Sequence, residues 1–190
     1  MANLKEIRGT LVQTYSSDPA NAVNGDIWYN STSCTFKCFR TQFQIWTAGG
    51  AMGTARYWLG GAGTNTAALA IGGLTATNFC CASTESYNGS AWTAGGAMAT
   101  ARAGLNGAGT NTAALAMSGS AAAGQVACVE SYNGSTWSAF SPMTFSRCGL
   151  GGAGTRTAAL AFGGRSSTLG NVTCTEMFNF GKSFKNFQMK

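Results

Sequence analysis

The chain has 190 residues, of which 27 are glycine, none is histidine and only 9% are charged. Two prolines exclude a collagen-like or polyproline chain, and the glycine content is typical of a protein with many tight turns. The formal net charge is +6, but the lysines and arginines are scattered rather than clustered. We therefore expect no nucleic-acid-binding surface.

Residues 1–24 precede the repeated part of the sequence, and either an attachment arm or a poorly ordered terminus is expected there. This segment has no apolar stretch followed by a small-residue cleavage site, so we do not expect it to be a secretory signal peptide. No apolar run approaches the roughly 18 residues that span a bilayer, so we expect no membrane insertion and synthesis in the cytoplasm. Four apolar residues stand among polar ones in the arm: Leu4, Ile7, Leu11 and Val12.

From Trp46 onward the sequence repeats with a step of 45 or 46 residues. The clearest copies are AGTNTAALA at 62–70 and 108–116, with AGTRTAALA at 153–161. If Phe180 is an insertion, Phe184 falls at the tryptophan position of the last copy. The positions that recur in register are Trp46, Trp92 and Trp137; Met52, Met98 and Met143; Arg56, Arg102 and Arg147; Leu69, Leu115 and Leu160; Gly72-Gly73, Ser118-Gly119 and Gly163-Gly164; Glu85, Glu130 and Glu176; and Tyr87, Tyr132 and Phe178.

Repeats of this length occur in helical arrays and in propeller blades. Glycine interrupts every few positions here, and each glycine inside a helix costs about 1 kcal/mol relative to alanine, so helices are excluded. The segments instead predict short strands, with a first strand at about 57–61 and a second, buried on both faces, at 66–71. Asn88-Gly89 predicts a type I′ hairpin between the third and fourth strands.

Four short strands in a meander are typical of a β-propeller blade, so the fold class is predicted to be all-β with about three blades and a partial one. The tryptophans would pack between adjacent blades, and small residues of the second strand would permit close approach near the axis. Three blades do not close a propeller, so homo-oligomerisation is expected to complete or cover them, with an atypical compact sandwich as the alternative. The predicted segments are the arm at 1–24, a partial blade hairpin at 25–46, repeats at 47–92, 93–137 and 138–184, and a basic tail at 185–190.

Few side chains in this sequence offer catalytic or metal-binding chemistry. The seven cysteines are odd in number, have no histidine beside them and are expected to be free thiols, so no metal site and no cofactor are predicted. A cysteine nucleophile usually needs a histidine base, and acid–base catalysis needs two carboxylates in different environments. Glu85, Glu130 and Glu176 occupy one repeat position, where we expect them to cap a turn or pair with the repeated arginine. An enzyme is therefore not expected.

The recurring pattern of Gly-Gly, Glu-x-Tyr, Trp, Met and Arg resembles the kelch repeat over about residues 46–184. A narrower resemblance involves the Gly/Thr/Ala-rich wording WTAGGAMATARAGLNGAGTNTAALA and the leader at 17–39, in which GDIWYNSTS opens a hairpin. Both look like kelch-like proteins of tailed phages, particularly those of marine and cyanobacterial hosts. This resemblance implies a non-enzymatic virion protein, such as a tail fibre, a tail appendage or a capsid decoration.

The resemblance also implies partners. The arm would dock onto other virion proteins, and the blades would form an outward platform. Two alternatives stay open at this point: an adhesin on the same particle that binds a host receptor or glycan, and a cellular kelch scaffold that binds a peptide partner.

Overall fold

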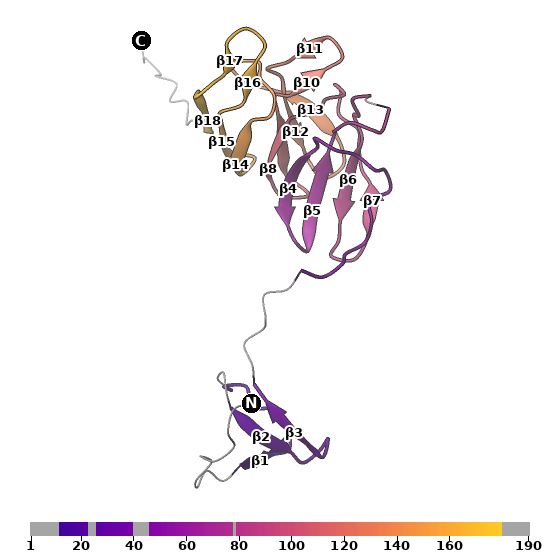
Figure 1. The fold of residues 1–190 in the computed structure, drawn as a ribbon, viewed down its shortest axis with the longest axis vertical. Coiled ribbons are helices and arrows are strands. Elements are labelled where there is room, and N and C mark those ends of the chain that lie inside the picture. The colour runs from indigo at the N-terminus through magenta and orange to yellow at the C-terminus, as the bar shows by residue number, and fades with distance from the viewer. Residues whose placement is uncertain (1–11, 23–25, 40–45, 78, 180–190) are drawn as a thin grey trace, which may run out of the picture. The chain divides into compact units, whose positions relative to one another are not determined.

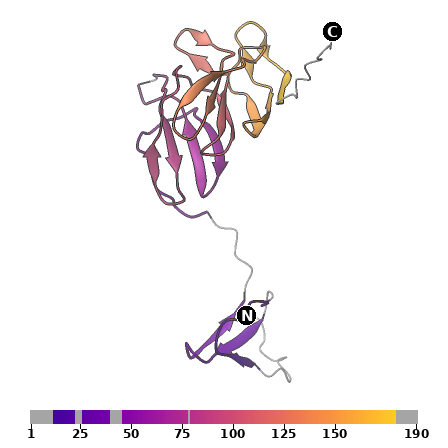
Figure 2. The ribbon, with the colours of Figure 1, turned by 180° about the vertical axis from the view of Figure 1, so that it is seen from behind.

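In the computed structural model, residues 12–22, 26–39, 46–77 and 79–179 are described, and within these ranges the chain forms eighteen strands and no helix. The predicted all-β class is confirmed for this part of the chain. Two compact units are present, Met1–Thr47 and Ala48–Lys190, and each is considered by itself. Figures 1 and 2 show the strands of both units from opposite sides.

The first unit contains a three-stranded sheet of β1 (Gln13–Tyr15), β2 (Ile27–Asn30) and β3 (Thr35–Cys38). β2 and β3 form the predicted hairpin, with antiparallel pairing, whereas β1 runs parallel to β2. β1 lies in the segment expected to be an arm. Val12, next to it, is 42% exposed, and the other three arm positions, Leu4, Ile7 and Leu11, lie outside the described residues.

Three sheets of the second unit arise from the sequence repeats, and neighbouring strands in each are antiparallel. The first repeat sheet contains β4 (Gly60–Thr64), β5 (Ala67–Ile71), β6 (Thr84–Tyr87) and β7 (Trp92–Ala94). The second repeat sheet contains β8 (Asn106–Gly109), β9 (Ala114–Met117), β12 (Val129–Tyr132) and β13 (Trp137–Phe140). The third repeat sheet has the described strands β14 (Gly151–Gly154), β15 (Ala158–Phe162) and β18 (Thr175–Asn179), and position 184 lies outside the described residues.

Two small hairpins are inserted between the second and third strands of a repeat. They are β10 (Ser120–Ala121) with β11 (Gly124–Gln125), and β16 (Arg165–Ser166) with β17 (Gly170–Asn171). These hairpins could not be predicted, because their strands are only two residues long and carry no hydrophobic alternation.

Two details of the predicted strands and turns were wrong. The first strand begins at Gly60 rather than Tyr57, because Trp58 has a φ of +55° and leaves the extended conformation. The turn at Asn88-Gly89 is not type I′, because only Gly89 has a positive φ. Instead, the Asn88 side-chain oxygen accepts hydrogen bonds from the backbone N–H groups of Ser90 and Ala91, which forms a four-residue loop.

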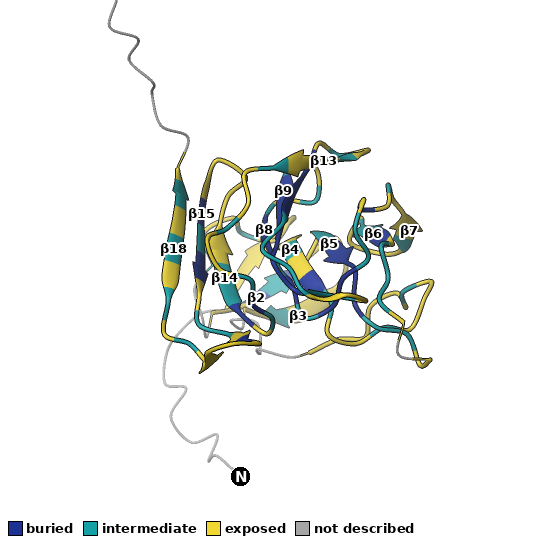
Figure 3. Ribbon diagram, turned by 90° about the horizontal axis from the view of Figure 1, so that it is seen from above, coloured by how far each residue is buried: buried dark blue, intermediate teal, exposed yellow. Residues whose placement is uncertain are grey.

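Hydrophobic cores lie between successive repeat sheets. Leu69 and Ile71 of the first sheet pack with Ala114 and Tyr132 of the second, and an equivalent cluster around Leu115 joins the second sheet to the third. Figure 3 colours most of β5 and β9 as buried, whereas exposed and half-buried residues alternate along β18. Each fully buried leucine contributes about 1.5–3 kcal/mol to folding, so these layers hold the unit together.

The strands that approach their counterparts most closely are the glycine-rich first strands, not the second strands as expected. β8 lies between β4 and β14. A Cβ at Gly107 would meet the carbonyl oxygen of Gly61 at 2.5 Å, so only glycine fits there. Within the described residues the three sheets do not close into a barrel or a propeller.

Candidate functional site

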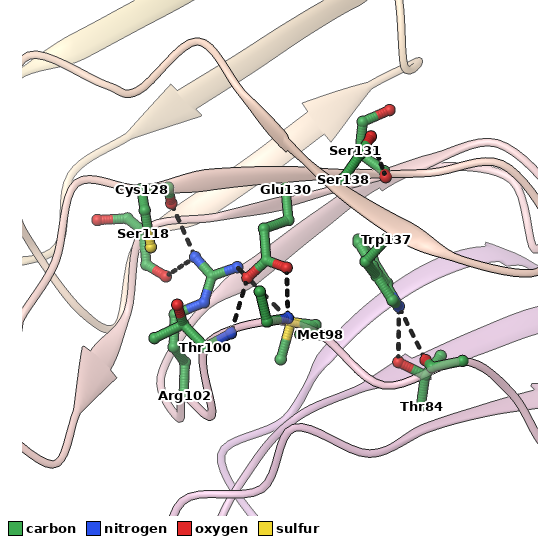
Figure 4. Close-up of polar contacts among 12 residues, drawn as sticks. Thr84, Met98, Thr100, Arg102, Ser118, Cys128, Glu130, Ser131, Trp137 and Ser138 are labelled. Atoms are coloured by element: carbon green, nitrogen blue, oxygen red, sulfur yellow. Dashed lines mark hydrogen bonds and ion pairs between the residues drawn. The ribbon is translucent and has the colours of Figure 1, made fainter.

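The recurring arginine and glutamate form a buried ion pair in each repeat. In the second repeat sheet, Nη2 of Arg102 lies 3.0 Å from Oε1 of Glu130, and the two side chains are 0% and 4% exposed (Figure 4). Nη1 of the same arginine donates to the carbonyl oxygens of Ser118 and Cys128. The predicted pairing is confirmed. It fastens the loop that carries Arg102 to two separate places on the sheet.

The other repeats reproduce this arrangement. Arg56 pairs with Glu85 at 2.6 Å, and Arg147 pairs with Glu176 at 3.0 Å. The second carboxylate oxygen accepts a backbone N–H in every copy, from Gly53, Ala99 and Thr144. The arginine Nε–H has no acceptor among the described residues in any copy, so part of the pairing energy offsets that buried donor. In each repeat the ion pair therefore holds the loop that carries the arginine against the sheet.

The recurring tryptophans do not all share one environment. The indole N–H of Trp137 donates to the Thr84 hydroxyl and to the Gly96 carbonyl oxygen, each at 3.1 Å, so this side chain packs against the preceding sheet as predicted (Figure 4). Trp92 is half-buried and its ring centroid lies 4.9 Å from that of Tyr87. The prediction was wrong for Trp46, which is fully exposed, because no ESYNGS segment precedes it to supply a paired strand.

The recurring glycine pairs turn the chain at the end of the second strand. Gly72 and Gly163 have φ of +60° and +63°, and their partners Gly73 and Gly164 have φ of +100° and +98°. In the middle copy Ser118 adopts the same left-handed conformation, with a φ of +55°. Its hydroxyl compensates by donating to a carbonyl oxygen, that of Val126 or that of Arg147, at 2.8 and 2.7 Å.

A depression of about 840 Å³ in the second unit is lined by residues of all three repeats. It lies where the first strands begin and where the small hairpins fold over them. Its lining residues are Trp58, Leu59, Ala103, Gly104, Leu105, Asn106, Ser120, Gln125, Cys148, Gly149, Leu150, Gly164, Arg165 and Asn171. We call this set the axial depression.

Trp58 is the outlier of the axial depression. It stands where the other repeats have Gly104 and Gly149, and all three residues share a left-handed backbone, with φ of +55°, +61° and +62°. That conformation costs a residue with a Cβ roughly 1–2 kcal/mol. The indole is 68% exposed, so burial returns little of this cost. Tyr57 lies beside it, with ring centroids 6.0 Å apart in an edge-on arrangement.

The two small hairpins contribute polar groups to the same depression. Gln125 is fixed by hydrogen bonds, because its amide donates to the Arg165 carbonyl oxygen at 2.9 Å. The guanidinium of Arg165 has no hydrogen-bonding or ionic partner among the described residues, and both Arg165 and Asn171 are exposed. A depression that contains an exposed aromatic ring together with amide and guanidinium groups is suited to a polar organic ligand with an apolar face. Sequence reasoning missed this site, although tryptophan in a glycine position was a visible signal.

The first unit contains a small polar cluster around Asp18. Its carboxylate accepts hydrogen bonds from Lys37 at 2.7 Å, Asn30 at 2.8 Å and Trp28 at 3.2 Å. The hydrogen bond from Lys37, followed by that from Asn30, lowers the pKa of Asp18 below its ordinary value of 3.8. Trp28 and Asn30 belong to the GDIWYNSTS motif, so part of that motif serves to hold the hairpin.

All seven cysteines are free thiols. Among the described residues no cluster of three or more histidine, cysteine, aspartate or glutamate side chains is placed to hold a metal ion. The same residues include no helix with the length and apolar character needed to cross a membrane.

Comparison with known proteins gives no family for this chain. No protein-family model matches the sequence, and no curated protein is significantly similar to it.

Proposed function

We propose that this chain is a non-enzymatic structural protein of a phage particle, in which the three repeat sheets act as kelch-like blades. Its place would be a tail fibre, a tail appendage or the capsid surface. The observation that carries the proposal is the division of the chain. The leader that resembles virion proteins folds into its own sheet of β1–β3, and the repeats form a separate unit.

The second unit has the character of a scaffold. Its whole complement of acidic residues is Glu85, Glu130 and Glu176, and each is held by an arginine inside its sheet. Its inter-sheet cores are apolar and its strands are short, as expected of stacked repeats that bury each other. In this proposal the first unit contacts other proteins of the particle and the second unit faces outward.

Immunogold labelling tests the proposal directly. Particles purified from the source of this sequence would be labelled with an antibody raised against the full chain. Label at the tail or its fibres supports an appendage, and label spread over the head supports a capsid decoration. Particles that carry no label, with the protein found only in the host cell, would refute a virion role.

A second candidate function, adhesion to a host surface glycan, is favoured by Trp58. A strained, exposed tryptophan contributes little to folding, and strained residues concentrate at binding sites. Its indole offers a flat face for the C–H side of a sugar ring, and Gln125, Arg165 and Asn171 offer hydrogen-bond donors for hydroxyl or carboxylate groups.

The glycan proposal is tested by titrating host surface polysaccharide into the full chain in a calorimeter. Trp58→Gly restores the residue found in the sister repeats, so it should keep the fold while weakening binding about tenfold or more. Leu169→Ala, at a residue that is 65% exposed and outside the axial depression, is the matched control and should bind normally. Equal binding by wild type and Trp58→Gly would refute a role for the depression.

A further inference from the structure

The third repeat sheet exposes an apolar face that the other two sheets bury. Leu69 and Ile71 of the first sheet are 1% and 0% exposed. At the positions equivalent to these two, Leu160 is half-buried and Phe162 is 43% exposed. Met177, which pairs with Leu160 across β15 and β18, is 76% exposed. The third sheet therefore exposes the face that, in the first and second sheets, packs against the next sheet.

The first repeat sheet ends on the matching face. The second sheet covers the first with Ala114 and Tyr132, which are 0% and 2% exposed. The equivalents on the first sheet are Ala68 and Tyr87, and both are only half-buried. The third sheet thus exposes the leucine side of an inter-sheet core, and the first sheet exposes the alanine and tyrosine side that packs against it in the internal contacts.

The tryptophan and threonine of the internal contact recur at opposite ends. Between the first two sheets, Trp137 donates to Thr84 at 3.1 Å. The position of Thr84 is occupied by Val129 in the second sheet, but the hydroxyl returns in the third sheet as Thr175, which is exposed. Trp92, at the position of Trp137, makes no indole hydrogen bond to a described residue. The Trp92 indole N–H in the first sheet and the Thr175 hydroxyl in the third sheet therefore lack the hydrogen bond that Trp137 and Thr84 form with each other.

Backbone hydrogen bonds between successive repeats also leave unpaired groups at the first and third repeats. Gly104 donates its N–H to the Trp58 carbonyl oxygen at 2.8 Å, and Gly149 donates to the Gly104 carbonyl oxygen at 2.7 Å. This ladder leaves the N–H of Trp58 at one end and the carbonyl oxygen of Gly149 at the other, neither of which has a partner among the described residues. A second ladder, from Gly73 to Arg102 and from Gly119 to Arg147, repeats the arrangement at 2.9 Å.

We propose that a second copy of this chain docks head to tail, so that the third repeat sheet of one copy packs on the first repeat sheet of the other. Two such contacts close two copies into a ring of six sheets, within the four to eight blades of known propellers. The contact would pair Trp92 with the partner copy's Thr175 and would cover Phe162 and Met177. This inference rests on the internal interfaces and is independent of the virion proposal.

Light scattering after size-exclusion chromatography tests the inference. At about 50 µM, where an interface with a Kd near 1 µM is mostly occupied, we expect a mass twice the 19.5 kDa of one chain. Met177→Lys places a charge in the contact and should give the mass of one chain. The matched control is Leu169→Lys, at a 65% exposed residue between β16 and β17, and it should keep the double mass. Urea unfolding of each variant establishes that it is folded.

Gly61→Ala tests the opposite face. Its new Cβ would lie 3.9 Å from the nearest atom, the Leu69 carbonyl oxygen, so the fold should tolerate it. The equivalent glycine, Gly107, has no such room, because the preceding sheet packs against it. We therefore expect Gly61→Ala to weaken dimerisation about tenfold or more without altering the unfolding curve of the monomer.

A mixing experiment separates head-to-tail docking from a symmetric contact. Met177→Lys keeps an intact first sheet and Gly61→Ala keeps an intact third sheet, so the mixture should form heterodimers through these two intact faces and should contain more dimer than Met177→Lys alone. If Gly61→Ala dimerises as well as wild type, the first sheet is not the partner surface and the inference is wrong. A wild-type chain that is monomeric at about 50 µM would also overturn it, as would one that dimerises only after residues 180–190 are removed.

Discussion

Arg102 and Glu130 meet at 3.0 Å inside the second repeat sheet, and neither side chain is more than 4% exposed. The arginine belongs to the loop that enters the sheet from the preceding repeat, and the glutamate belongs to β12. A contact formed within each sheet therefore also fixes the path of the chain between sheets. This explains why the pair recurs with the same spacing as the repeat itself.

Glu130→Gln should destabilise the second unit by about 3–5 kcal/mol, because it leaves the Arg102 charge buried without a counter-charge. Glu176→Gln is the matched comparison. The same pair is formed there, but the glutamate side chain is 19% exposed and water screens the loss, so we expect about 1–2 kcal/mol. Urea unfolding monitored by tryptophan fluorescence measures both. Equal losses in the two variants would show that burial does not set the strength of this pair.

Gly107→Ala should be among the most disruptive small substitutions in the chain. The new Cβ would lie 2.5 Å from the Gly61 carbonyl oxygen and 2.9 Å from its carbon, and backbone atoms cannot rotate away. We expect a loss of about 1–3 kcal/mol or more, measured by thermal unfolding. Gly61→Ala, compared in dilute solution, should change stability little. A tolerated Gly107→Ala would mean that β4 and β8 are further apart than the structure has them.

Ser118 departs from the Gly-Gly pattern, and its hydroxyl explains the departure. Ser118→Ala keeps the strained left-handed backbone, with its φ of +55°, but removes the hydrogen bonds to the backbone of Val126 and Arg147. We expect a loss of about 1–3 kcal/mol in urea unfolding. Ser118→Gly loses the same bonds but relaxes the backbone, so it should be about 1 kcal/mol more stable than the alanine variant. The reverse order would contradict the hydroxyl's compensating role.

The repeat made much of the second unit predictable from the sequence. Nearly identical sequence in three places predicted equivalent strands. Three equivalent arginines and glutamates predicted a structural ion pair in each repeat rather than a catalytic site. The strand start and the turn type that were predicted wrongly each depended on a single residue. The start of β4 moved to Gly60 because Trp58 is left-handed, and the Asn88 turn changed type because the asparagine side chain bonds the loop backbone.

The axial depression could not be predicted, because it joins residues from three repeats and from two hairpins too short to carry a pattern. Gln125 and Arg165 are 40 residues apart and meet only through a hydrogen bond between the hairpins. Trp58 alone was visible beforehand, as the one bulky residue in a glycine position. Aligning the repeats and noting the positions where one copy differs from the others identifies Trp58.

The contact between Asp18 and Lys37 should make the first unit sensitive to acid. The pKa of Asp18 is lowered below its ordinary value of 3.8, first by the hydrogen bond from Lys37. A lowered folded-state pKa means that the contact stabilises the unit above the ordinary value and that this stabilisation is lost as the pH falls through the lowered one. Carboxyl-carbon NMR of the full chain follows the titration. Lys37→Met should move the Asp18 pKa upward toward 3.8, and Asn30→Ala should move it by less, because Lys37 is the larger cause. An Asp18 pKa that stays unchanged in Lys37→Met would show that the 2.7 Å ion pair is not formed in solution.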